Sequence, residues 1–147
     1  MKPINEMKTT FISRSVNEGY ARAAVSAFVA QLDPTVEEIS DITVAVSEAV
    51  TNAIVHAYPH ELGPITLTVS LYENNRVVVR VRDRGLGIEN VPQAMEPLFT
   101  TGGEERSGLG FSVMSSFTDK LRVRSTPGKG TTVTLEKYIA RRVNSRS

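Results

Sequence analysis

The chain has 147 residues and a formal net charge of +1, with 40% hydrophobic and 22% charged residues. These proportions are those of an ordinary globular domain, and the chain is long enough to bury a hydrophobic core without added cross-links. We therefore expect one domain over 1–139 and a disordered basic tail over 140–147. The absence of cysteine excludes disulfides, thiolate catalysis and cysteine-bound zinc. The small net charge gives no reason to expect nucleic acid or a membrane as a partner, and the sequence shows neither a transmembrane run nor a signal peptide, so we expect a cytoplasmic protein.

The first elements are predicted to be a strand over 8–13 and a helix that ends before Pro34. Ser15 and Glu18 have the spacing of a capping box, in which each side chain binds the backbone N–H of the other residue. This spacing predicts the start of the helix at Ser15.

The second helix carries the most informative residues of the chain. Thr35 and Glu38 repeat the capping-box spacing and predict its start. Glu48, Asn52 and His56 follow one another at intervals of four, so they project from one face. An apolar stripe is predicted on another face by Ile39, Ile42, Val46, Ala49, Val50, Ala53 and Ala57. An acid and an amide set among apolar residues are typical of a pocket floor, whereas His56 is interpreted as a helix-end residue with a supporting role.

A hairpin is predicted next, because apolar residues alternate with polar ones over 65–71 and again over 77–82. Asn74-Asn75 between them suits a tight turn, since asparagine tolerates a positive φ. The polar partners in the return strand include Arg80 and Arg82, which we interpret, with Arg122 and Arg124 further on, as one solvated sheet face.

The remaining chain is expected to hold an irregular segment over 84–107, a short helix over 108–119, and a second hairpin over 120–138. Helices followed by hairpins predict an α+β fold, a two-layer sandwich whose mixed, mainly antiparallel sheet is covered by helices on one face. So long an irregular segment in a compact chain is usually a functional loop or lid.

Two glycine-containing motifs are ambiguous when each is taken alone. The segment 83–87, Asp-Arg-Gly-Leu-Gly, is typical of a turn, but Asp83 could also accept an exocyclic amino group while the glycines admit a flat ring. It is not a dinucleotide fingerprint, because Asn90 stands where the third glycine would be. Segment 107–110, Ser-Gly-Leu-Gly, opens a helix, where backbone amides attract phosphate. Segment 127–130, Pro-Gly-Lys-Gly, is better interpreted as a hairpin turn than as a P-loop.

The order of these motifs resembles the GHKL family of ATP-binding domains, which includes gyrase and the histidine kinases. The similarity is carried by Ser-Glu-Ala-Val-Thr-Asn-Ala-Ile (47–54), Asp-Arg-Gly-Leu-Gly (83–87), Pro-Leu-Phe-Thr-Thr (97–101), Glu-Arg-Ser-Gly-Leu-Gly-Phe (105–111) and Gly-Thr-Thr-Val (130–133). Within the family the chain is similar to the anti-sigma factor serine kinases, over essentially its whole length.

The resemblance implies an ATP and Mg²⁺ site with a lid. In the family's pattern, Asn52 would bind Mg²⁺ and Glu48 would act as general base toward a substrate serine. Asp83 would bind the adenine amino group, with Gly85, Gly87 and Thr131 completing the adenine pocket. The phosphates would be held by the lid and the start of the following helix, through Thr100, Arg106, Ser107, Gly108, Leu109 and Gly110. The family's lid carries a lysine after Thr-Thr, where this chain has Gly102-Gly103, so Arg106 is the nearest cation for the γ-phosphate.

The resemblance also implies partners. The chain would sequester a sporulation sigma factor of the sigma F type, phosphorylate an anti-anti-sigma antagonist protein, and form a homodimer. On the first helix, Arg22 shares a face with Glu18, Ser26, Val25 and Val29, which is either an ordinary solvent face or the partner surface. The alternatives to a sporulation kinase are a sigma-binding module without kinase activity and a stress-response anti-sigma kinase. A detached histidine-kinase domain is disfavoured, because no phosphoacceptor helix is found.

Overall fold

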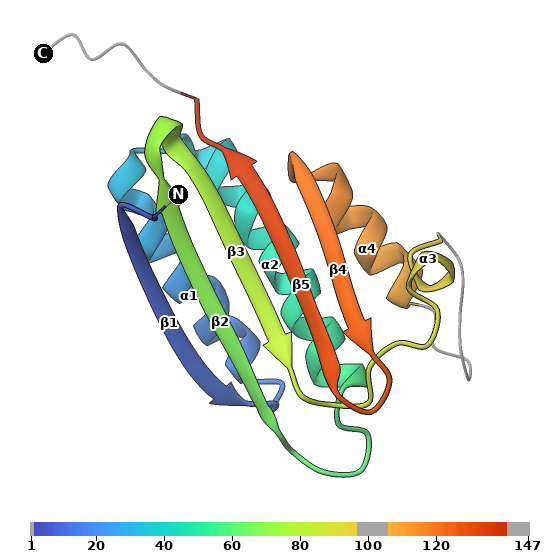
Figure 1. Ribbon diagram of the computed structural model, residues 1–147. Coiled ribbons are helices and arrows are strands. Elements are labelled where there is room, and N and C mark those ends of the chain that lie inside the picture. Colours follow the sequence, from blue (N-terminus) through green and yellow to red (C-terminus); the bar gives the residue numbers. More distant parts are fainter. Residues whose placement is uncertain (1, 97–105, 141–147) are drawn as a thin grey trace, which may run out of the picture.

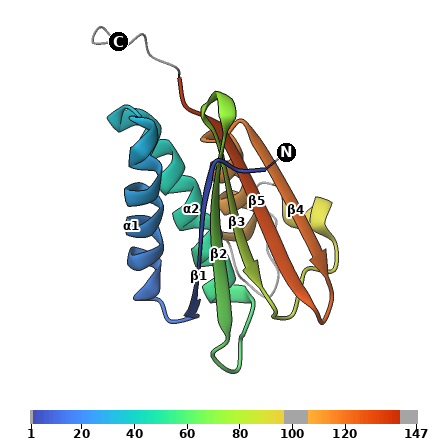
Figure 2. The same cartoon turned by 60° about the vertical axis from the view of Figure 1, so that its left-hand side comes forward.

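The computed structural model describes residues 2–96 and 106–140, and for residues 106–108 only the backbone. It is a two-layer α+β fold in which an antiparallel five-stranded sheet has the order β1-β2-β3-β5-β4. The strands are β1 (Asn5–Ile12), β2 (Pro64–Tyr72), β3 (Arg76–Asp83), β4 (Lys120–Thr126) and β5 (Gly130–Tyr138). The helices are α1 (Asn17–Val29), η1 (Ala30–Leu32), α2 (Val36–His56), η2 (Glu73–Asn75), α3 (Val91–Ala94) and α4 (Arg106–Ser116). The long helices all lie on one side of the sheet, behind it in Figure 1, and Figure 2 shows α1 and α2 to the left of the strands.

The core lies between the sheet and this helical layer. Alternate residues of β2 and β3 point into it, among them Leu67 and Val81, which are paired across the two strands and almost completely buried. From α2 the predicted apolar stripe enters the core, and Ile42, Val46, Ala49, Val50 and Ala53 are all buried. Ala45, which is not part of that stripe, is buried as well. The apolar residues that the sequence pattern singled out on the strands and on α2 therefore lie on the inner faces of the sheet and of the helical layer.

The two predicted capping boxes have opposite outcomes. At α2, Thr35 Oγ1 accepts from the N–H of Glu38, and Glu38 Oε1 accepts from the N–H of Thr35, as predicted. At α1 the prediction is wrong, because the helix begins at Asn17 after Val16 and no side chain caps it. Glu18 is instead paired with Arg22 one turn later, so its carboxylate stabilises the helix surface and not its first N–H.

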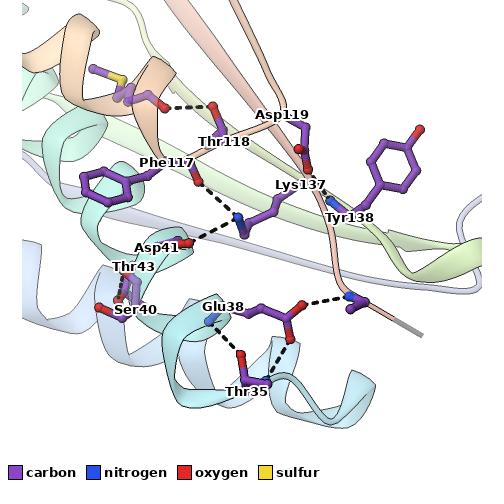
Figure 3. A network of polar contacts seen from close by, with 12 residues as sticks. Thr35, Glu38, Ser40, Asp41, Thr43, Phe117, Thr118, Asp119, Lys137 and Tyr138 are labelled. Carbon is purple, nitrogen blue, oxygen red and sulfur yellow. Dashed lines mark hydrogen bonds and ion pairs between the residues drawn. The ribbon is translucent and has the colours of Figure 1, made fainter. Parts of the chain in front are cut away.

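A polar network joins the start of α2 to the end of the chain (Figure 3). Lys137 of β5 donates to Asp41 of α2 and to the carbonyl of Phe117, which follows α4, both at 3.4 Å. Glu38 also accepts from the N–H of Ala140 at 2.7 Å. These contacts fix β5, α2 and α4 relative to one another, and these three elements contribute to the cleft described below.

The two hairpins agree with the sequence prediction. In the turn between β2 and β3, Asn74 and Asn75 both have positive φ, at 65° and 58°. The second hairpin joins β4 to β5 through a turn in which Gly128 has a φ of 79°. The structure adds the short helix α3, which the sequence did not predict and in which Asn90 Oδ1 accepts from the N–H of Gln93. In the parts of the chain that the structure describes, no helix is long and apolar enough to cross a membrane.

Candidate functional site

A cleft of about 600 Å³ opens between the second half of α2, the loop after β3, α3, α4 and the β4–β5 turn. Its floor is apolar and buried, and is formed by Ala49, Ala53, Val81, Phe111 and Val133. Four polar residues that the sequence singled out also line it, namely Asn52, His56, Asp83 and Thr131. An apolar cleft with a few convergent polar groups is the usual form of a small-molecule site.

At one end of the cleft stands the carboxylate of Asp83. The residue is only 7% exposed, and its Oδ1 accepts from the N–H of Gly85 at 2.9 Å and from the N–H of Thr131 at 3.2 Å. Burial raises the pKa of Asp83 above its ordinary value, and the two backbone hydrogen bonds only partly oppose this. The site thus holds a buried carboxylate as a fixed acceptor, and Thr131 joins it from β5, the neighbouring strand.

The glycines after Asp83 are required by close backbone packing. A β-carbon at Gly85 would lie 2.1 Å from the carbonyl oxygen of Ala57, at the end of α2. Gly87 has a φ of 77°, and a β-carbon there would lie 2.3 Å from the carbonyl oxygen of Thr126. The segment 84–87 is therefore held between the end of α2 and the β4–β5 hairpin, and hydrogen bonds at Leu86 reach both sides.

Two hydroxyl groups that the sequence analysis missed hold the same segment in place. Ser125 Oγ accepts from the N–H of Ile88 and lies 2.7 Å from Thr131 Oγ1. Tyr58 accepts from the N–H of Arg84 and donates to the carbonyl of Pro64, both at 2.7 Å. Neither role has a local sequence signal, because the N–H groups that these hydroxyls bind, at Arg84 and Ile88, lie 26 and 37 residues away along the chain.

Glu48 and Asn52 meet beside Gly110, where α4 crosses α2; Asn52 lines the cleft, whereas Glu48 is not among its lining residues. A β-carbon at Gly110 would lie 3.2 Å from Asn52 Nδ2 and 3.3 Å from Glu48 Oε2, so the helices can pack at this distance because residue 110 has no side chain. The Nδ2 atom of Asn52 is buried without a hydrogen-bond partner. An orphaned buried polar group is rare in folded proteins and often marks a functional position.

The residues present fit a magnesium–nucleotide complex. Magnesium prefers oxygen ligands, keeps several waters, and is usually held by one or two side chains together with phosphates. Among the described residues, no group of three or more histidines or acids could hold a metal alone. The amide oxygen of Asn52 is a ligand that Mg²⁺ accepts, and the unpartnered Nδ2 donor of the same side chain could bind a phosphate oxygen, so Asn52 with the Glu48 carboxylate near it matches such a sparse site.

The other predicted site residues lie in different places. Thr100 falls outside the described residues, and Arg106, Ser107 and Gly108 form the start of α4 without described side chains. Leu109 follows them and is 45% exposed. The structure gives α4 as Arg106–Ser116, two residues earlier at its start than the predicted 108, and the first backbone N–H groups of a helix lack partners within it.

Arg22 lies on α1, which contributes no residue to the cleft. It is exposed and paired with Glu18, but Val25 and Val29 of the predicted face are fully buried in the domain's own core. This corrects the sequence interpretation, because only the polar part of that face is accessible to a partner.

Comparisons with known proteins agree with this geometry. Residues 13–137 match the family described as the histidine kinase-like ATPase domain. The fold is that of the RsbU and RsbW domain structure from Mycobacterium tuberculosis, with a TM-score of 0.69 at 22% identity, covering 95% of this chain and 34% of that one. It is also found in the blue-light activated histidine kinase domain from Erythrobacter litoralis, with a TM-score of 0.58 at 21% identity, covering 83% of this chain and 61% of that one. The chain is thus a member of the histidine kinase-like, or GHKL, ATPase family.

Its relatives define the branch of that family. The chain is 56% identical to the anti-sigma F factor of Caldanaerobacter subterraneus subsp. tengcongensis, over 93% of this chain and 96% of that protein. It is 51% identical to the anti-sigma F factor of Geobacillus thermodenitrificans, over 93% of this chain and 94% of that protein. It belongs with the anti-sigma F factors.

Proposed function

We propose that this chain is an anti-sigma factor of the sigma F type that, with Mg²⁺ and ATP, phosphorylates a serine of its anti-anti-sigma antagonist. The observation that carries the kinase part is the approach of Glu48 and Asn52 to Gly110, because Asn52 lines the same cleft as the buried acceptor Asp83. An ATP molecule needs these two kinds of environment at once, an enclosed place for its base and a metal-binding place for its phosphates.

Each residue has a distinct task in this proposal. Asp83 accepts a hydrogen bond from the amino group of adenine, while Val81 and Phe111 contact the flat ring from the apolar floor. Gly85 and Gly87 keep the loop close enough for this contact. Thr131 adds a polar contact beside Asp83.

At the phosphate end, Asn52 would hold Mg²⁺ through its amide oxygen, and the metal would neutralise charge on the phosphates. The start of α4 would supply backbone N–H donors at Ser107, Gly108 and Leu109. Glu48 lies one turn before Asn52 on the same helix face and would accept the proton of the substrate serine. Thr100 and Arg106 are assigned to the lid and to the γ-phosphate by family resemblance.

The sigma factor and the antagonist would bind outside the cleft. The high identity to anti-sigma F factors over nearly the whole chain supports both partners. We assign Arg22 to this contact surface, because it is exposed on α1, and we expect the complex to contain a homodimer of this chain.

The deciding experiment is a phosphorylation assay with purified antagonist and Mg-ATP, run with the wild type and Glu48→Gln. We expect Glu48→Gln to bind ATP normally and to lose transfer by a factor of about 100 or more, since a positioned base contributes about that much. Glu37→Gln is the matched control, because Glu37 is exposed in the first turn of the same helix and far along it from the cleft. Unchanged transfer in Glu48→Gln would contradict the assignment of the base. Absence of transfer in the wild type, with sigma binding intact, would leave a sigma-binding module without kinase activity.

A further inference from the structure

The open face of the sheet, opposite the helices, carries a concentrated positive charge. Two rows of side chains cross it in register: Thr10, Thr66, Arg82, Thr132 and Arg124 in one, and Lys8, Thr68, Arg80, Thr134 and Arg122 in the other. We call these residues the basic rows. They contain threonines, arginines and one lysine, and no carboxylate, although the whole chain has a net charge of only +1. The face is turned toward the viewer in Figure 1.

The four arginines of the basic rows form no ion pair with the residues that the structure describes. Arg82, Arg122 and Arg124 are exposed and Arg80 is half-buried, and none of them pairs with an acid that the structure describes. Arg76 also lies on β3 but outside the basic rows, and it differs from the four arginines because it is paired with Glu136 and stacked on Tyr72. The unpaired arginines of the two strands thus lie in the half of the face toward Asp83.

The spacing of these arginines is regular. Arg80 and Arg82 are two residues apart on β3, and Arg122 and Arg124 are two apart on β4, so each pair is separated by about 7 Å. Strand β5 with Thr132 and Thr134 lies between the pairs and separates them by about 10 Å. All four charges lie within about one Debye length of a neighbour at 0.1 M salt, so their fields add.

We propose that the basic rows bind an extended acidic polypeptide segment of a partner protein, with carboxylates at alternate positions. An extended chain presents every second side chain on one side at about 7 Å, which matches the spacing along β3 and β4. Arginine can bind each carboxylate through two parallel hydrogen bonds, and the intervening threonine hydroxyls supply further donors and acceptors. This surface is separate from the nucleotide cleft and from Arg22 on α1.

Other occupants fit less well. A second copy of the same face would set these cations against each other. Single-stranded nucleic acid is usually held by aromatic residues that stack on its bases, and the basic rows contain none. A flat sheet face does not enter a duplex groove, so base edges would stay out of reach.

The test uses the full chain with a fluorescein-labelled peptide of alternating glutamate and serine, read by anisotropy at low salt. A peptide of the same composition with its glutamates in one block and a single-stranded oligonucleotide are the comparison probes. We expect the alternating peptide to bind at least about fivefold tighter than the block peptide, and Arg122→Glu to weaken it about tenfold. Arg14→Glu, the matched control in the exposed β1–α1 loop, should change it less than about twofold.

Melting temperature and ATP affinity should be unchanged in Arg122→Glu, because the side chain is exposed on an edge strand away from the cleft. The proposal is overturned if the two peptides bind equally, if Arg14→Glu and Arg122→Glu weaken binding alike, or if no peptide binds. Tighter binding of the oligonucleotide than of the alternating peptide would overturn it in favour of a nucleic-acid surface. None of these outcomes bears on the kinase assay, so the two proposals fail separately.

Discussion

The two ends of the cleft are built in opposite ways. At the Asp83 end, backbone and hydroxyl groups satisfy one another, and the loop is held on both sides by hydrogen bonds to Ala57 and from Gly128. Near Glu48, the buried Nδ2 atom of Asn52 has no hydrogen-bond partner. The comparison teaches that the Asp83 end is organised by its own internal contacts, while the Asn52 end keeps a polar atom whose partner would come with a ligand. Variants at the two ends should therefore behave differently in stability and in binding.

The largest effect is expected from Asp83→Asn, in nucleotide binding and not in stability. The asparagine oxygen can still accept from Gly85 and Thr131, but its amide would face the adenine amino group with a donor in place of an acceptor. We expect ATP affinity to fall about 100-fold, measured by calorimetry, since a lost hydrogen bond to a charged group contributes about 1.5–3 kcal/mol. A fall in unfolding free energy that matched the loss of affinity would show that Asp83 is mainly structural.

The pH dependence of stability offers a second test of Asp83. Its pKa in the folded protein is raised by burial, so the folded state holds the proton more tightly than the unfolded state. The unfolding free energy should then decrease as pH rises from about 4, the ordinary pKa of aspartate, through the raised pKa, and change no further above it. Asp83→Asn should lack this decrease. Identical profiles for the two proteins would contradict the burial argument.

Gly85→Ala should have the next largest effect, on stability. Its β-carbon would lie 2.1 Å from a backbone oxygen, so the loop or the end of α2 must move. We expect the unfolding free energy to fall by about 2–3 kcal/mol in urea denaturation. Gly19→Ala is the matched control, because in α1 the nearest atom to a new β-carbon is 3.9 Å away. It should raise the unfolding free energy by about 0.5–1 kcal/mol, and equal losses in both variants would remove the packing explanation.

Asn52→Ala should affect stability and the binding of Mg-ATP in different ways. Removing a buried amide without a partner should leave the unfolding free energy unchanged or raise it by about 1 kcal/mol. The affinity for Mg-ATP should nevertheless fall about tenfold or more, while the affinity for metal-free ATP changes less. Asn17→Ala is the control, since that amide donates to the carbonyl of Ile12 and its loss should lower stability by about 1 kcal/mol. Equal losses of metal-bound and metal-free ATP would argue against a metal ligand at residue 52.

The smallest effect is expected from Ser125→Ala. This change leaves the N–H of Ile88 and the hydroxyl of Thr131 without their shared partner, and should lower the unfolding free energy by about 1 kcal/mol. ATP affinity should fall only a few-fold, because the ligand contacts themselves remain. In Ser116→Ala, which loses only a bond to the Ser112 carbonyl within α4, thermal unfolding should be unchanged. A similar result for both serines would mean that the hydroxyl of Ser125 does not support the loop.

Local signals predicted the parts of the fold that depend on neighbouring residues. Thr35 and Glu38 cap α2 because both partners lie within four residues of each other. Asn74 and Asn75 form their turn because a positive φ is a property of the residue itself. The capping box predicted at Ser15 did not form. The pattern considers only Ser15 and Glu18, whereas Glu18 pairs with another nearby residue, Arg22. The short helix α3 was missed because four residues give no periodic signal.

The sequence by itself determined the α+β class, the core face of α2, the placement of Glu48 and Asn52 on one helix face, and the family to which the chain belongs. It could do so because helix and strand periodicities and motif order are carried along the chain. Only the tertiary structure decided that Gly110 leaves room for Asn52, that Ser125 and Tyr58 hold the loop after Asp83, and that the four arginines predicted on one sheet face pair with no acid that the structure describes. Each of these depends on atoms that are far apart in sequence, and their separation is fixed only when the helices pack on the sheet.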